Sequence, residues 1–114
     1  MNNSILTTVK LLLGIEPTYT AFDSQLIVYI NSVFSHLQQM GIGPETGYSI
    51  SSANNTWNEF IGGRIDIELV KTYVYLKVRM MFDPPAGSFV VDSFERIIAE
   101  HEWRLVNSLE INNS

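Results

Sequence analysis

The sequence feature that most constrains the fold is a regular spacing of apolar residues between residues 22 and 40. Large apolar side chains recur there in steps of three and four residues, at Phe22, Leu26, Ile30, Val33, Leu37 and Met40. This spacing places them on one face of an α-helix, which has about 3.6 residues per turn. Thr20 and Asp23 are spaced like a capping box, and Gly41 provides a stop. The pattern predicts a long helix over 20–40.

Two shorter helices are predicted from their caps. Ser4 can cap a helix over 5–13, which has an apolar face and is followed by Gly14, a residue suited to a left-handed stop. Thr56 and Glu59 form a capping box for a single-turn helix over 57–61. Both assignments rest on residues within a few positions of each helix end.

Two further helices are separated by a double proline. A fourth helix from about residue 65 to 81 carries a broad apolar surface and ends at Asp83-Pro84-Pro85, because proline cannot donate a backbone hydrogen bond and restricts the residue before it. Ser88 can cap a fifth helix, whose expected core face comprises Val90, Phe94, Ile97, Ile98, His101 and Leu105. The predicted fold is an all-α bundle of four to five helices, with the helices over 20–40, 65–81 and 88–105 supplying the core.

Residues 41–55 are predicted to form one long irregular loop, rich in Gly, Ser and Asn, with room for a short strand at 48–50. The loop is longer than the joining of two helices requires, so we expect it to be mobile and to contact a neighbouring subunit. The chain of 114 residues is expected to be a single domain over 1–114, with a frayed tail at 106–114.

Composition narrows the possible functions. The formal net charge is −5 and the seven Lys and Arg residues are scattered, so the sequence lacks the basic stripe that neutralises DNA phosphates. There is no cysteine, which excludes disulfides and thiolate metal sites. No signal peptide is evident, and no apolar run approaches the roughly 20 residues of a membrane span.

A search for catalytic or cofactor-binding patterns gives none that is complete. The chain has two histidines, His36 and His101, and no ligand constellation surrounds either. The segment 101–105 opens like a zinc-protease helix, but Leu105 stands where the second histidine is required. Residues 41–44 resemble a phosphate loop only in their glycines, because no Gly-Lys-Ser/Thr follows. The sequence predicts no enzyme and no metal or cofactor.

Aromatic residues point instead to an interaction surface. Aromatic side chains and Arg are enriched in protein interfaces, and this chain has many aromatics for one small core. Trp103 lies about 180° around its helix from Phe94, so it is expected to point outward. The candidate interface residues are Trp103, Arg96, Val106, Tyr48, Ile50 and Trp57. The alternative is that the amino-terminal helix covers Trp103 as part of the core.

Several short blocks follow one another along the chain. They are Ile5-Leu6-Thr7-Thr8-Val9-Lys10, Leu12-Leu13-Gly14-Ile15, Phe22-Asp23, Ile30-Asn31-Ser32-Val33-Phe34, Gly41-Ile42-Gly43-Pro44, Tyr48-Ser49-Ile50, Thr56-Trp57, Leu69-Val70-Lys71-Thr72-Tyr73-Val74-Tyr75-Leu76-Lys77-Val78-Arg79, Phe82-Asp83-Pro84-Pro85 and Glu102-Trp103-Arg104-Leu105. In this order they resemble the head-tail connector proteins of tailed bacteriophages and prophages. The blocks cover nearly the whole chain. No block is a catalytic motif, so the resemblance rests on their number, order and spacing.

The resemblance implies a structural adaptor in the virion. Such a protein would be assembled in the bacterial host cytoplasm and form a ring, expected to be dodecameric, at the head-tail interface. Its implied partners are other copies of itself, the portal protein and a downstream head-closure or tail-joining protein. DNA would pass through the ring without specific binding, and no membrane is involved.

Three alternatives remain open from the residues alone. The first is a small helical DNA-binding regulator, for which Lys71, Lys77 and Arg79 would supply the basic residues, although the net charge opposes it. A small enzyme is the second, and a toxin-antitoxin or chaperone-like module is the third.

Overall fold

The computed structural model describes residues 3–60 and 67–113, and within them every regular element is a helix. The helices are α1 (Ile5–Leu13), α2 (Asp23–Gln39), α3 (Trp57–Phe60), α4 (Ile67–Phe82) and α5 (Ser88–Asn113). In the described part of the chain, the only β-type pairing is a single bridge between Ser4 and Thr56. The predicted all-α class is confirmed. Residues 48–50 form no strand, and residues 61 and 65–66 of the expected helices lie outside the described ranges.

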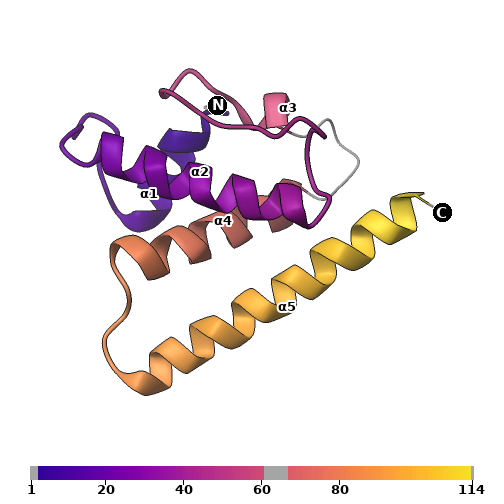
Figure 1. Cartoon of the computed structure of the whole chain (residues 1–114). Helices are drawn as coiled ribbons and strands as arrows, with labels where there is room; N and C mark the ends of the chain where they lie inside the picture. The colour runs from indigo at the N-terminus through magenta and orange to yellow at the C-terminus, as the bar shows by residue number, and fades with distance from the viewer. Residues whose placement is uncertain (1–2, 61–66, 114) are drawn as a thin grey trace.

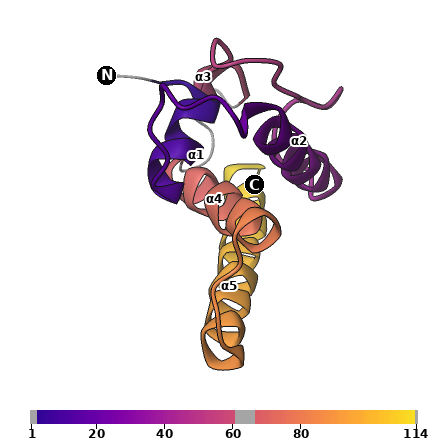
Figure 2. The same ribbon diagram turned by 90° about the vertical axis from the view of Figure 1, so that its left-hand side faces the viewer.

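Three helices surround the core, and one of the three differs from those that the sequence predicts. Helices α1, α2 and α4 lie against one another, while α5 leaves the group as a long arm (Figures 1 and 2). Ile5, Leu6 and Val9 of α1 are buried. Of the described α5 side chains only Leu105 is fully buried, and Val90 and Ile97 remain 40% and 43% exposed. The expectation that α5 is the third core helix is therefore wrong, and α1 takes that place.

The direction of α5 explains this difference. The turn at 83–87 sends the start of α5 away from the other helices, and from about Phe94 onward the helix comes close to α4, where the Arg79 guanidinium lies 5.5 Å from the Phe94 ring centre (Figures 1 and 2). The apolar stripe of α5 is therefore covered near Leu105 and Ile98 and uncovered near Val90. Helix α5 continues to Asn113, and the fraying that the sequence predicts at 106–114 stays a prediction.

Local caps form largely as the sequence predicts. The Ser4 hydroxyl oxygen accepts the Thr7 N–H at 3.2 Å, and Gly14 ends α1 with a φ of 83°. The Glu59 carboxylate accepts the Thr56 N–H at 3.2 Å, as a capping box requires. These bonds satisfy backbone donors that a helix end leaves without a partner.

The start of α2 differs from the predicted capping box. Phe22 occupies the cap position without any side-chain hydrogen bond, and α2 begins at Asp23. The Asp23 carboxylate instead pairs with the ammonium group of Lys10, at 2.8 Å. Lys10 is only 2% exposed, and its Nζ also donates to the carbonyls of Pro17 at 2.9 Å and Tyr19 at 2.7 Å. Two ammonium protons thus have carbonyl acceptors, Asp23 compensates the charge, and the α1–α2 connection is fixed to α1.

The loop over 41–55 lies against the helices. The Asn31 side chain donates to the carbonyl of Ile50 at 3.0 Å and accepts its N–H at 2.7 Å. Ile42 and Ile50 are buried, and a Cβ at Gly43, where φ is 93°, would lie 2.5 Å from the Phe60 ring. The loop is therefore attached to α2 and α3 at several points, and its expected contact with a neighbouring subunit stays a prediction.

Candidate interaction surfaces

The outer face of α5, meaning Phe89, Arg96, Glu100 and Trp103, is exposed to solvent. Phe89 is 78% exposed and Trp103 is 67% exposed, and Arg96 and Glu100 are also exposed. The prediction that Trp103 points outward is confirmed, and the alternative that α1 covers it is wrong. Val106, the remaining α5 candidate, is half-buried. Phe89 and Trp103 lie on the same face of α5, about 21 Å apart along the helix at 1.5 Å per residue, with Arg96 and Glu100 between them.

Helix α5 is attached to the core mainly through Glu102 and Leu105. The Tyr73 hydroxyl donates to the Glu102 carboxylate at 2.7 Å, and His36 Nε2 lies 3.4 Å from the same oxygen. Burial raises the pKa of Tyr73, and the hydrogen bond and charge of Glu102 raise it further. The Tyr73 hydroxyl therefore stays neutral and keeps donating. These contacts connect α5 to both α2 and α4.

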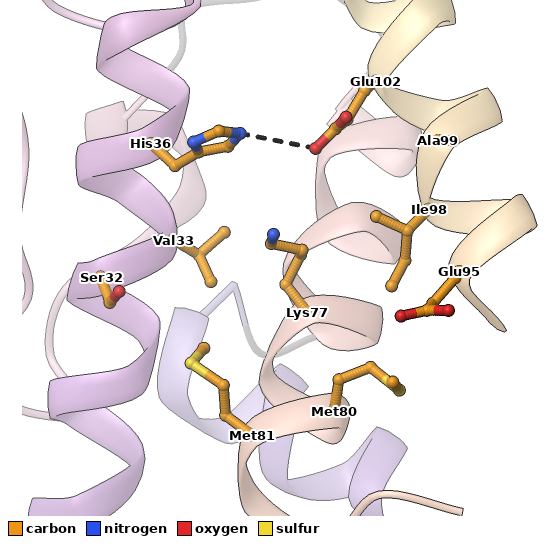
Figure 3. Close-up of a pocket in the computed structure, with 10 residues that line it drawn as sticks. All are labelled: Ser32, Val33, His36, Lys77, Met80, Met81, Glu95, Ile98, Ala99 and Glu102. Atoms are coloured by element: carbon orange, nitrogen blue, oxygen red, sulfur yellow. Dashed lines mark ion pairs between the residues drawn. The ribbon is translucent and has the colours of Figure 1, made fainter. Parts of the chain in front are cut away.

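A groove of about 450 Å³ opens between α2, α4 and α5. Its apolar lining includes Val33, Met80, Met81 and Ile98, and the His36–Glu102 pair closes one end (Figure 3). We call this cavity the inter-helix groove. Sequence reasoning missed it because its walls come from three segments far apart in the chain, and no local pattern links them.

The inter-helix groove also contains two charged groups, Lys77 on α4 and Glu95 on α5, both shown in Figure 3. Neither forms an ion pair with another residue in the described ranges. Ser32 and Ala99, which also line the groove, are exposed, so the groove opens to solvent.

The three remaining candidate residues lie elsewhere, around a cluster of aromatic rings. The Phe34 ring centre lies 5.4 Å from that of Tyr48, 6.3 Å from that of Trp57 and 4.6 Å from that of Phe60. Trp57 is fully buried and its Nε1 donates to the Thr8 hydroxyl at 3.1 Å.

Trp57 and Ile50 are core residues, although the sequence analysis named both as interface candidates. Ile50 is 3% exposed and Trp57 is 0% exposed, so neither offers surface to another protein. Tyr48 is half-buried and retains some contact with solvent. The structure therefore brings Trp103 and Arg96 together on α5 and separates them from the loop residues.

Tyr48 and Asn55 of the loop both hydrogen-bond to Glu59 of α3, and we call this group the polar clamp. The Tyr48 hydroxyl donates to Glu59 Oε1 at 2.8 Å, and the Asn55 amide donates to the same oxygen at 3.2 Å. Partial burial, then the Glu59 hydrogen bond and charge, raise the pKa of Tyr48 to about 12. The hydrogen bond from Tyr48, followed by those from Asn55 and Thr56, lowers the pKa of Glu59.

The clamp makes stability depend on pH in two directions. The folded pKa of Tyr48 lies above its ordinary value of 10.0, so its contribution is complete below pH 10 and is lost as the pH rises towards 12. The contribution of Glu59 is complete above its ordinary pKa of 4.5 and is lost as the pH falls below it. We expect the stability difference between wild type and Tyr48→Phe, measured by urea unfolding, to be constant from pH 6 to 9 and to shrink above pH 10. An equal difference at pH 7 and pH 11 would contradict this assignment.

Other site types receive little support from the described residues. No group of three His, Cys, Asp or Glu residues gathers there to hold a metal ion. No described helix is long and apolar enough to cross a membrane. Of the basic residues proposed for DNA binding, Lys71 pairs with Glu68 at 3.2 Å, and the Arg79 guanidinium lies 5.5 Å from the Phe94 ring centre. These two side chains are therefore engaged within the chain.

Comparison with known proteins agrees with the resemblance seen in the sequence. A family model described as phage connector protein matches residues 5–112, which is almost the entire chain. No curated protein and no solved structure gives a match. The family is one of structural head-tail connector proteins, and the blocks from Ile5 to Leu105 fall within the matched range. The chain therefore belongs to the phage connector protein family.

Proposed function

We propose that the protein is the subunit of an adaptor ring that joins the portal vertex of a phage head to the tail-joining proteins. The family assignment supports a connector role at the head-tail interface. The ring, its dodecameric stoichiometry and the portal and head-closure partners are our proposal. The observation that carries it is the outer face of α5, where Phe89 and Trp103 are 78% and 67% exposed. Exposed aromatic side chains of this size favour a protein partner.

The shape of the chain also suits an adaptor. Helix α5 extends from the group formed by α1, α2 and α4, so its surface is accessible along much of its length (Figure 2). The net charge of −5 is unfavourable for binding a polyanion, and this suits a ring through which DNA must pass without adhering. Which acidic residues line such a channel depends on the arrangement of the ring.

Removal of the protein from its phage tests this proposal. A phage lacking this reading frame should fill its heads with DNA and build separate tails, but the two should not join, because the adaptor is missing. Electron microscopy of lysates would show tailless heads, and the wild-type chain supplied in trans should restore tailed particles. Intact tailed particles formed without the protein would refute the adaptor role.

A further inference from the structure

Helix α5 carries two different surfaces on opposite sides. Ile98, Glu95 and Glu102 line the inter-helix groove. At about 100° per residue, Phe89 lies about 180° and Trp103 about 140° around the helix from Ile98. The outer face of α5 and the groove therefore point in different directions, and one copy of the protein can use both at the same time.

The inter-helix groove has the size and lining to receive an aromatic side chain. A cavity of about 150 Å³ in a protein core accepts one benzene-sized group. The groove, at about 450 Å³, thus has space for an indole ring and a second side chain. Met80 and Met81 lie along it, and methionine adapts its shape to aromatic partners and contacts them favourably through sulfur (Figure 3).

The charges of the two surfaces are complementary. The groove contains Glu95 and Lys77, which lack an ion-pair partner among the described residues. The outer face of α5 contains Arg96 and Glu100, both exposed and within about 40° of each other around the helix. Arg96 of one copy can pair with Glu95 of another, and Glu100 can pair with Lys77.

From these features we infer that the outer face of α5 in one copy docks into the inter-helix groove of the next copy, with the Trp103 indole against Met80 and Met81. The contact joins two different surfaces, so each docked copy still has a free groove for another copy. Contacts of this kind propagate from copy to copy and close as a ring when the rotation between copies divides a full turn, whereas a two-fold contact stops at a dimer. The inference rests on the proposed ring and specifies how its subunits touch.

Cysteine cross-linking tests this arrangement without background, because the chain has no native cysteine. Ser32→Cys places a thiol beside the groove, and Glu100→Cys places one on the outer face. A short bis-maleimide should convert the double variant into a ladder of dimers, trimers and larger species on a denaturing gel. Neither single variant should give a ladder, and Ser24→Cys, an exposed α2 position that does not line the groove, should not replace Ser32→Cys.

Two further changes make the test specific. Adding Trp103→Ala to the double variant should remove the ladder. Arg96→Glu should also remove it, and Glu95→Arg introduced with Arg96→Glu should restore it, because the reversed charges again attract. Products that stop at dimers, or a ladder that survives Trp103→Ala, would overturn the inference.

Cross-linking of two samples, the purified chain and phage particles, distinguishes a failure of this inference from a failure of the proposed function. If the chain is present in particles but gives no ladder, the docking mode is refuted and the adaptor role stands. If the chain is absent from particles, the adaptor role is refuted, and the ladder of the purified chain then decides the docking mode alone.

Discussion

Replacing Lys10 with methionine is expected to lower the free energy of unfolding by about 3 kcal/mol, because removing one partner of a buried ion pair leaves the other partner without compensation. Lys10 is 2% exposed and binds the Asp23 carboxylate and the carbonyls of Pro17 and Tyr19. Methionine would fill the space but could neither donate to the two carbonyls nor compensate the Asp23 charge. For a domain of this size the melting temperature should fall by about 10 °C or more.

Lys71 provides the matched control for this change. Its ammonium group pairs with Glu68 in a contact three residues apart along α4, with side chains 24% and 74% exposed, and lies 6.0 Å from the Trp57 ring centre. A partly exposed ion pair and a cation–π contact each contribute about 1 kcal/mol or less, so Lys71→Met should lower the urea midpoint much less than Lys10→Met. If Lys10→Met and Lys71→Met had equal effects, the buried ammonium group would not be what holds the α1–α2 connection.

Replacing Trp103 with alanine is expected to leave folding intact and to prevent assembly. The indole is 67% exposed, so the melting temperature should stay within about 3 °C of wild type. Burying an indole against another protein contributes about 2 kcal/mol, which corresponds to about thirtyfold in the dissociation constant of each contact. Every subunit of a ring would lose this contact, so joined heads and tails should disappear.

Val28 offers the control for Trp103. It is 65% exposed on α2 and does not line the groove, so Val28→Ala removes an exposed apolar group from another surface. This variant should retain both its melting temperature and its assembly, measured by thermal unfolding and by counting tailed particles. A large loss of stability in Trp103→Ala, with assembly intact below the melting temperature, would show that the indole stabilises the subunit itself.

The sequence by itself determined the helices and several of their ends. The three-four spacing of α2, the Ser4 cap, the Gly14 stop and the Thr56–Glu59 capping bond all appear in the structure. Each depends on residues within about one or two turns of each other, so local geometry is sufficient to predict it. The family could also be read from the sequence, because the order of its blocks spans the chain and the family match covers residues 5–112.

Only the tertiary structure decided which helix faces were buried. Trp57 and Trp103 both occur in helices, yet Trp57 is 0% exposed and Trp103 is 67% exposed. Trp57 is buried because Phe34 packs on its ring and Thr8, 49 residues earlier, accepts its N–H. The direction of each helix after its turn follows from such distant contacts, including those of Lys10. A periodic pattern identifies an apolar face, but the neighbours that cover it come from other parts of the chain, so the sequence could not assign α1 to the core or reveal the inter-helix groove.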